Sequence, residues 1–258
     1  MEVKEILDSL EKGEITSNKA KKLLSLYAIE TIENIAKIDV NRRKRRGIPE
    51  VIFAQTKELD EIKKIIKTTL EKTNSVLVSK IKAEHYSKLI AFGKKSKYKI
   101  KSGKHSSTLL FFKKPIKFHG GKVGIITAGT SDIGVAEEAR LMCEAMNCKS
   151  ITSYDVGVAG IQRIFPVLKK MISEDVECLI VVAGMEGALA TLVSSMTDIP
   201  VIGVPSSVGY GYGEKGIAAL ASMLQSCSLG LSVVNIDGGI AAGSIAANIA
   251  NRIILKRN

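Results

Sequence analysis

Five short apolar runs in the second half of the chain constrain its fold most strongly. They span residues 123–127, 150–154, 176–182, 200–204 and 231–236, and stretches of helical character separate them. Because these runs are apolar at most positions, they fit a parallel sheet covered on both faces better than a half-solvated antiparallel sheet. We therefore expect an α/β fold whose C-terminal part is a doubly wound parallel sheet of about five strands.

The first half of the chain follows a different pattern. Residues 1–36 carry an apolar stripe at helical spacing, with a plausible helix cap at residues 16–18, which predicts one or two helices. Beyond a basic loop, the sequence predicts strands at 51–54, 75–81 and 98–101, helices at 58–72 and 83–93, and a linker near 113–121. We expect a smaller α+β region over residues 1–119 and a second domain over residues 120–258.

Charge divides the chain in the same way. The net charge is +12, yet from Gly120 onward 10 Lys and Arg residues stand against 12 Asp and Glu residues. The whole positive excess therefore falls before Gly120, and it is densest at residues 42–46. The smaller N-terminal region is expected to be the basic one.

No segment has the pattern of a membrane helix. The longest uncharged stretch, residues 216–236, is broken by polar residues, and the charged N-terminus is unlike a signal peptide. We expect a cytoplasmic protein without a membrane partner. Small residues at 216–224 and 240–250 allow close helix packing, which predicts a homo-oligomer.

The four cysteines lack the spacing of a zinc or iron–sulfur site. Cys143, Cys148 and Cys178 lie in apolar helical or strand-like surroundings and are expected to be small buried side chains. Cys227 differs, because it falls at an expected helix end beside two glycine loops. It is a candidate reactive thiol, with a buried core cysteine as the alternative.

The loops that follow the apolar runs hold most of the small and reactive residues. They span residues 129–132, 155–160, 183–187, 205–211 and 235–239. In an open parallel sheet, such loops lie together at the carboxyl ends of the strands, where ligands bind. The glycines of the first loop, at residues 128–132, do not match the GxGxxG fingerprint, and no P-loop follows a strand. The sequence thus predicts a ligand site of another type at this edge.

Single residues in these loops allow two interpretations. The turn at Gly129 suits a phosphate or ribose, but Ser131 or Asp132 would also cap the helix that begins at Ile133. Glu186 either complements a helix N-terminus or acts through burial or a bound metal.

Taken in order, these loops resemble those of the LarB family. The matching runs are 124–132, 154–160, 183–189, 203–211, 226–228 and 233–237, and residues 39–52 resemble the lead-in motif of the family. LarB proteins are pyridinium-3,5-biscarboxylic acid mononucleotide synthases of nickel-pincer cofactor biosynthesis. They share their fold with the aminoimidazole ribonucleotide carboxylase PurE. The resemblance implies a PurE-like three-layer αβα domain and an octamer like those of PurE-like proteins.

The resemblance also implies a reaction. Nicotinic acid adenine dinucleotide is carboxylated at C5 of its pyridinium ring, with CO2 or bicarbonate as co-substrate, and its phosphoanhydride is hydrolysed to release AMP. Because a pyridinium ring is electron-poor, a thiolate must first add at C6 to make C5 nucleophilic. Cys227 is the thiol that matches the family. Arg163 is a candidate cation to stabilise its thiolate, since a helix C-terminus disfavours that form.

The remaining roles are assigned on the same basis. Asp132, Glu186 and Asp237 are candidates for proton removal and hydrolysis, either as bases or through a divalent cation such as Mg2+ held by Asp132 and Glu186. No organic cofactor is expected. The residues expected to bind substrate are Gly129, Thr130, Ser131, Asp155, Arg163, Ser206, Ser207, Gly209, Gly211, Asn235 and Asp237.

Two departures from the family pattern stand out. Gln162 replaces the usual histidine, and the run Gly238-Gly239-Ile240-Ala241 replaces Asn-Gly-Phe-Gly. The missing imidazole is either dispensable or marks a different activity. The alternatives are therefore a purine-pathway ribonucleotide carboxylase or mutase, and a non-catalytic nucleotide-binding protein of the same fold.

The basic run at residues 42–46 has three interpretations. It is a solvated loop, a group near the phosphates of the dinucleotide, or a nucleic-acid patch. We do not expect a nucleic-acid partner, because no helix-turn-helix, RNA-binding motif or aromatic stacking platform accompanies the run.

Overall fold

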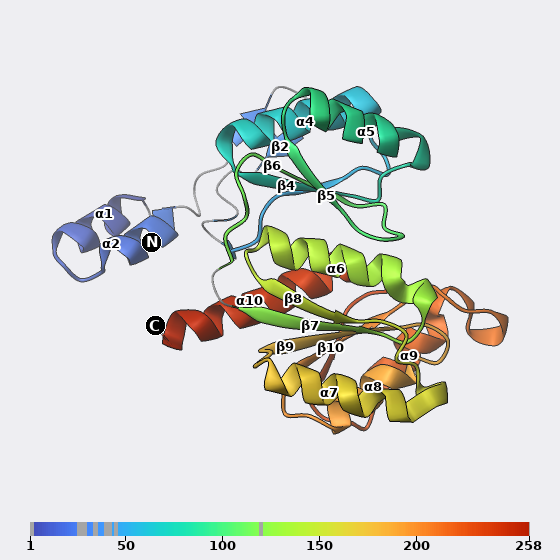
Figure 1. Ribbon diagram of the computed structural model, residues 1–258. Helices are drawn as coiled ribbons and strands as arrows, with labels where there is room; N and C mark the ends of the chain where they lie inside the picture. The colour runs from blue at the N-terminus through green and yellow to red at the C-terminus, as the bar shows by residue number, and fades with distance from the viewer. Residues whose placement is uncertain are drawn as a thin grey trace.

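The structure is a computed structural model that describes residues 3–24, 30–32, 36–38, 43, 46–118 and 121–257 (Figure 1). Helices α1 (Val3–Glu11) and α2 (Ser17–Leu24) form the first segment. The backbone N–H of Lys19 donates to Thr16 Oγ1 at 3.3 Å, so Thr16 caps α2 as predicted.

The predicted helical lead-in does not continue to residue 36. Strands β1 (Glu30–Ile32) and β2 (Ala36–Ile38) pair in antiparallel register instead. The β-branched residues Thr31 and Ile32 are stiff at χ1 and favour extended backbone, and this outweighs the helical spacing. Residues 25–29 and 33–35 of the predicted lead-in lie outside the described residues.

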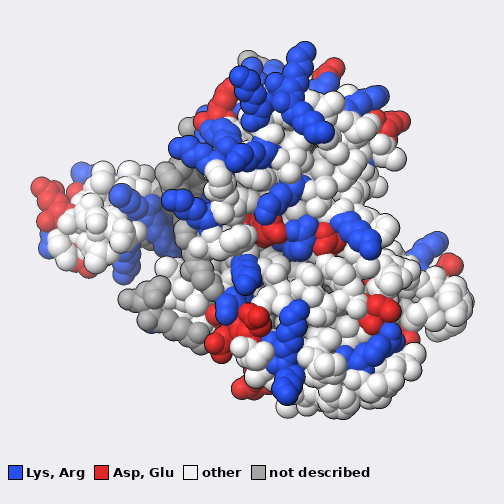
Figure 2. All heavy atoms as spheres, in the orientation of Figure 1, with Lys and Arg blue, Asp and Glu red and all other residues white. Residues whose placement is uncertain are grey.

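A four-stranded sheet forms the basic N-terminal region. Its elements are β3 (Val51–Phe53), α4 (Leu59–Lys72), β4 (Ser75–Ser79), α5 (Ala83–Lys95), β5 (Lys99–Ser102) and β6 (Leu109–Phe112). The strand order is β3-β4-β6-β5, with β3 parallel to β4 and the other pairs antiparallel. Figure 2 shows Lys and Arg side chains gathered over this part of the molecule. Strand β6 was not predicted from the sequence, although its four residues are all apolar and all buried.

The second half forms the predicted parallel sheet. Its strands are β7 (Lys122–Thr127), β8 (Lys149–Ser153), β9 (Cys178–Ala183), β10 (Val201–Pro205) and β11 (Leu231–Val233), in the order β11-β10-β9-β7-β8. All four pairings are parallel. Two separate clusters of buried apolar side chains pack on its faces. The expected doubly wound α/β architecture is confirmed.

Helices complete the three layers, as Figure 1 shows. Helices α6 (Ile133–Ala145) and α10 (Gly239–Arg257) pack together on one face of the sheet, and α7 (Ile164–Ser173) and α8 (Ala188–Ser195) lie on the other. Helix α9 (Ile217–Leu224) contacts α8 and β10. No helix in the described ranges combines the length and the apolar character that a membrane span requires.

Helix α6 also joins the two halves of the chain. It contacts strands β4 and β6 of the N-terminal sheet, and Leu77, Leu110 and Phe112 belong to the same apolar cluster as its buried face. Lys101 Nζ lies 2.6 Å from a carboxylate oxygen of Glu144, and Thr108 Oγ1 donates to Glu138 at 3.1 Å. One helix therefore supports the N-terminal sheet on one side and the parallel sheet on the other.

Candidate functional site

A cavity of about 280 Å³ opens at the carboxyl ends of the parallel strands. Four of the five predicted loops line it. The lining residues are Ala128, Gly129, Ser131, Asp132, Gly157, Val158, Ala159, Ala183, Gly184, Met185, Glu186, Ala188, Leu189 and Val208. The structure thus brings together loops that are distant in sequence, as expected for this edge of an open sheet.

Asp132 is the buried carboxylate of this cavity. Its side chain accepts a hydrogen bond from the backbone N–H of Gly129 at 2.8 Å and another from Ser206 Oγ at 2.5 Å. Only 3% of Asp132 is exposed. It makes no capping hydrogen bond to α6. Instead it ties the end of β7 to the end of β10.

This environment shifts the acidity of Asp132. Burial raises the pKa of its carboxyl group above the ordinary value. The hydrogen bonds from Ser206 and Gly129 oppose that shift, and the negative charge of Asp237 adds to it. The result is a carboxyl group that holds a proton more readily than an exposed aspartate does.

The donor set does not suit a metal bridged between Asp132 and Glu186. Each carboxylate oxygen of Asp132 already accepts a hydrogen bond from the protein. Glu186 lines the cavity but is exposed rather than buried. Within the described ranges, no group of three or more His, Cys, Asp or Glu side chains is placed to hold a metal ion. We therefore assign no chemical step to an ion held by Asp132.

Glycine at position 184 lets two of the loops meet. A Cβ atom there would lie 2.1 Å from the carbonyl oxygen of Val208 and 2.8 Å from Ser206 Oγ. The adjacent N–H of Met185 donates to the Val208 carbonyl at 3.0 Å. The β9–α8 loop is therefore fixed directly against the loop that follows β10.

The fifth loop, at residues 235–239, contacts the loop that follows β10. The N–H of Ser207 donates to Asp237 Oδ1 at 2.8 Å, and the N–H of Asp237 donates to the Pro205 carbonyl at 2.9 Å. Asp237 adopts a left-handed backbone conformation with φ of 55°. Asn235 is exposed, and its side-chain oxygen accepts a hydrogen bond from the N–H of Ile236 at 2.9 Å. Neither Asn235 nor Asp237 lines the cavity.

Asp155 and Arg163 bond within the loop that carries them and do not line the cavity. Arg163 Nη1 lies 3.3 Å from Asp155 Oδ2, and its guanidinium also donates to the carbonyls of Asp155 and Gly157. Both side chains are exposed and lie outside the cavity lining. Gln162 is exposed in the same turn. Arg163 therefore shapes the loop that presents Gly157.

Of the other predicted binding residues, some line the cavity and some do not. Gly129 and Ser131 line the cavity at the start of α6, whereas Thr130, Ser207, Gly209 and Gly211 are exposed residues outside the lining. Tyr210 is 80% exposed and Tyr212 fully exposed, so the loop after β10 presents its aromatic rings to solvent. Ser206 is fully buried and acts on the cavity through Asp132.

The cysteines separate as predicted. Cys143, Cys148 and Cys178 are buried, and Cys227 is exposed. Burial raises the pKa of the Cys143 thiol well above its ordinary value and raises the pKa of Cys148 and Cys178 to about 12. These three thiols are therefore unreactive at neutral pH.

Cys227 lies toward the amino ends of the strands, whereas the cavity lies at their carboxyl ends. It sits in the loop between α9 and β11, so it approaches the amino ends of the strands. The side chains of Ser226 and Ser228 bond to Thr191 and Ser194 of α8 at 3.0 and 2.5 Å, and Cys227 is not among the residues that line the cavity. One copy of the chain does not bring Cys227 together with Asp132.

A second buried carboxylate was not predicted from sequence. Glu138 is 3% exposed on α6, forms an ion pair with Lys80 at 3.5 Å and accepts from Thr108. Burial raises the pKa of Glu138, and the charge of Asp237 acts in the same direction. Two features of the sequence could have indicated this buried carboxylate. One is the Glu137-Glu138 pair on the apolar side of an expected helix, and the other is the glycine-rich segment at 238–243.

Comparison with known proteins agrees with this architecture. Residues 122–254 match the family model for AIR carboxylase, which defines the class of the parallel-sheet domain. Residues 29–105 match the family model for the LarB/PurE-like N-terminal domain. The chain therefore belongs to the LarB family and carries a PurE-like C-terminal domain.

Relatives cover the chain to different extents. An uncharacterized protein of Methanocaldococcus jannaschii is 47% identical over 250 residues, which is 96% of each chain. A probable N5-carboxyaminoimidazole ribonucleotide mutase of Methanothermobacter thermautotrophicus is 32% identical over 133 residues, 50% of this chain and 37% of the relative. The N5-carboxyaminoimidazole ribonucleotide mutase of Pyrococcus horikoshii is 28% identical over 137 residues, 52% of this chain and 68% of the relative. The chain is thus similar to an enzyme family of carboxylases and mutases in its second half.

Proposed function

We propose that this protein carboxylates nicotinic acid adenine dinucleotide at C5 of the pyridinium ring and hydrolyses its phosphoanhydride. The products are pyridinium-3,5-biscarboxylic acid mononucleotide and AMP. The observation that carries the proposal is the exposure of Cys227, because the chemistry needs an accessible thiol and the other three are buried. The LarB-type N-terminal domain supports the same assignment.

The carboxylation balances without an oxidant or reductant. The thiolate of Cys227 forms a C–S bond at C6, and the displaced ring electrons make C5 nucleophilic. C5 then attacks CO2, a base removes the C5 proton, and the electron pair expels the thiolate to restore the aromatic ring. The added carboxylate is the only new group on the ring.

The cavity residues suit the anionic parts of this substrate. Gly129 and Ser131 stand at the N-terminus of α6, where backbone N–H groups attract phosphate. We assign Asp132, which is buried at the cavity wall, as the group that holds a proton, and the exposed Glu186 as the group that accepts one. In the hydrolysis step, water attacks one phosphorus and AMP leaves with the bridging oxygen.

The proposal requires a homo-oligomer, and an octamer is expected. Since Cys227 and Asp132 stand at opposite edges of one sheet, the thiol must reach the cavity of another copy. The surroundings of Cys227 suit such a contact, because Leu224 is 67% exposed and Leu229 is 94% exposed. Apolar side chains gathered in this way are typical of protein–protein interfaces.

The reaction is tested by product analysis. The purified protein is incubated with nicotinic acid adenine dinucleotide, bicarbonate and Mg2+, and the small molecules are separated and weighed by mass spectrometry. We expect AMP and a dicarboxylated mononucleotide in equal amounts. Return of the unchanged dinucleotide would reject the proposal.

A second candidate is supported by the mutase relatives. N5-carboxyaminoimidazole ribonucleotide mutase activity would use the same domain fold, and the relatives that carry this name match half of the chain. It is less well supported, because the chain has Met185 and Glu186 where that family carries a histidine-bearing loop. Parallel incubation with N5-carboxyaminoimidazole ribonucleotide distinguishes the two functions.

A further inference from the structure

A second pocket, of about 490 Å³, lies between the N-terminal sheet and the end of α6. Three segments surround it: the turn from α4 to β4, the linker after β6, and the residues at the C-terminus of α6. The lining residues are Arg43, Lys72, Thr73, Asn74, Ser75, Lys113, Lys114, Pro115, Ile116, Lys117, Ala145 and Asn147. Five of these side chains are cationic and none is a carboxylate.

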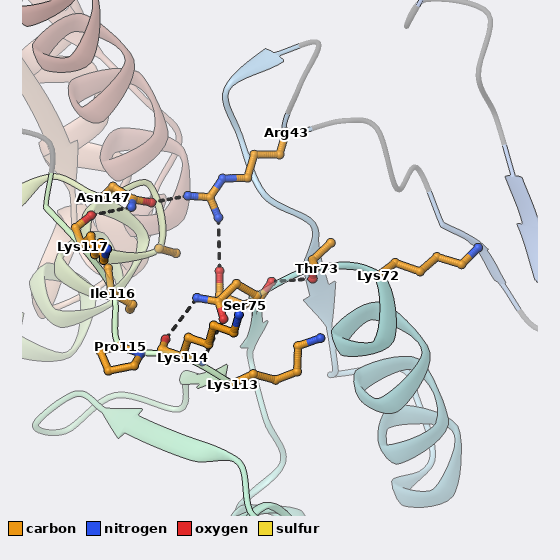
Figure 3. A pocket seen from close by; sticks show the side chains of 12 residues that line it. Arg43, Lys72, Thr73, Ser75, Lys113, Lys114, Pro115, Ile116, Lys117 and Asn147 are labelled. Atoms are coloured by element: carbon orange, nitrogen blue, oxygen red, sulfur yellow. Dashed lines mark hydrogen bonds between the residues drawn. The ribbon is translucent and has the colours of Figure 1, made fainter.

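Arg43 is the central cation. Its guanidinium donates to Ser75 Oγ at 3.4 Å and to the side-chain oxygen of Asn147, and Figure 3 shows it between these two residues. Burial lowers the pKa of Arg43, and no carboxylate in the described part of the chain forms an ion pair with it. A partly buried cation that has only neutral partners favours an anionic ligand, because desolvation of the charge is otherwise uncompensated.

The lysines around Arg43 are held on a fixed backbone. Asn74 accepts from the N–H of Lys114 at 2.8 Å and donates to its carbonyl at 3.1 Å. Asn147 donates to the carbonyl of Lys117 at 2.5 Å. Within the described ranges, the ammonium groups of Lys113, Lys114 and Lys117 form no ion pair. Two amide side chains therefore fix the backbone that carries Lys114 and Lys117.

We propose that this pocket binds a nucleoside phosphate, with its phosphate at Arg43 and the three lysines. Arginine and lysine are the side chains that bind phosphate most often. The volume lies within the usual range for small-molecule pockets, roughly 300–1,000 Å³, and exceeds what inorganic phosphate fills. Pro115, Ile116 and Ala145 offer an apolar wall to the nucleoside. No aromatic residue lines the pocket, so it lacks the stacking platform of single-stranded nucleic-acid binders.

This pocket is distinct from the candidate active site. Ala145 and Asn147 lie at the C-terminal end of α6, while Gly129 and Asp132 precede its N-terminus. The helix has 13 residues, which at about 1.5 Å per residue separates the two sites by roughly 18 Å or more within one chain. Binding in the pocket does not depend on the proposed carboxylation.

Calorimetric titration of the protein with ADP tests the proposal. At roughly 0.15 M salt, we expect saturable binding that the Lys113→Gln/Lys114→Gln variant weakens by about ten-fold or more. The matched control, Lys94→Gln/Lys95→Gln, removes the same charge from an exposed part of α5 and should bind ADP as the wild type does. Equal loss in the control pair, or no binding, would overturn the proposal.

Two further measurements use the unmodified protein. Acetylation of lysines is read by mass spectrometry, and ADP should protect Lys113, Lys114 and Lys117 while leaving Lys94 and Lys95 reactive. Competition then separates the ligand classes: AMP and ATP should displace ADP, whereas citrate and a short RNA should not. Equal displacement by citrate or tighter binding of RNA would contradict a nucleoside phosphate site.

Discussion

Asp132 shows how far sequence reasoning reaches at the scale of one residue. Its place in a reactive loop was predicted, because a carboxylate after a small-residue turn at a strand end is visible in the sequence. Its bond to Ser206 was not, since the two residues are 74 positions apart and meet only where β7 and β10 end. Whether the carboxylate caps α6 or faces the cavity depended on that contact.

The pH dependence of stability should report on Asp132. Because its folded pKa is raised, the folded state binds this proton more tightly than the unfolded state, where the pKa is about 3.9. Its favourable contribution is complete below that pH and is lost as the pH rises through the raised pKa. Asp132→Asn should therefore unfold at a higher temperature than the wild type at pH 7, and the difference should shrink in acid.

Asparagine can keep both contacts in that variant, since its oxygen accepts from Gly129 and the Ser206 hydroxyl accepts as well as donates. Thermal unfolding followed by circular dichroism from pH 4 to 8 measures the effect. If the wild type remains the more stable protein at pH 7, the buried charge of Asp132 does not destabilise the folded state. We also expect the variant to lose at least about ten-fold in carboxylation rate.

Gly184 makes a second prediction at this scale. Gly184→Ala should lower the free energy of unfolding by about 1–3 kcal/mol, because its Cβ would overlap the backbone oxygen of Val208. Gly209→Ala is the matched control, since a Cβ there meets its nearest atom at 3.6 Å in ordinary contact. Urea unfolding of the two variants decides the point, and equal stability would refute the close approach.

At the scale of elements, α6 is the most informative helix. Its position was predicted within the apolar second half, but its double role was not. The buried polar residues Glu138 and Glu144 lie on it because the basic N-terminal region supplies Lys80, Lys101 and Thr108 as partners. Glu137 accepts a hydrogen bond from the backbone N–H of Lys104 in the same region. Sequence periodicity describes one amphipathic face, so it does not reveal a helix that packs on two sides.

Arg140 holds the charges on this helix together. It donates to Glu137 at 2.8 Å and to Glu144 at 2.5 Å. Burial acts to raise the pKa of Glu137, but hydrogen bonds from Arg140 and Tyr154 and the charge of Arg140 outweigh it, so the pKa is lowered. Glu137 therefore stabilises the fold above its unfolded pKa, and this contribution is lost as the pH falls.

Arg140→Ala should lower the free energy of unfolding at pH 7 by about 3 kcal/mol, because it removes the cation that pairs with the largely buried Glu137 and leaves Glu144 with Lys101 alone. The deficit should decrease toward pH 4, because the contribution of Glu137 is lost as the pH falls toward its lowered pKa. Denaturant unfolding at both pH values measures it. Arg252→Ala, at an exposed position of α10, is the control and should change stability by no more than about 0.5 kcal/mol. A deficit independent of pH would point to lost packing alone.

At the scale of the whole molecule, the position of Cys227 sets the architecture of the active site. The class of fold and the four cavity loops could be predicted from the sequence, because strand order in a doubly wound sheet fixes which loops meet. The distance of Cys227 from them could not be recognised from motif order alone. It becomes visible only when α9 is seen to carry the chain to the amino edge of the sheet.

Subunit mixing tests the shared site. Asp132→Asn and Cys227→Ser should each be strongly impaired alone, yet co-assembled from an equal mixture of unfolded chains they should regain activity. Random assembly leaves both residues intact in about one quarter of the sites of a symmetric oligomer. Cys227→Ser mixed with the double variant is the control and should recover nothing. Absence of recovery in the first mixture would place both residues in one chain.

The thiol mechanism itself is tested most directly by isotope transfer. Wild type and Cys227→Ser are each incubated with nicotinic acid adenine dinucleotide and 13C-bicarbonate, and the mononucleotide product is weighed. We predict one 13C atom per product molecule from the wild type, and a rate lower by about a thousand-fold or more in the variant. Labelled product formed by Cys227→Ser at the wild-type rate would contradict the account.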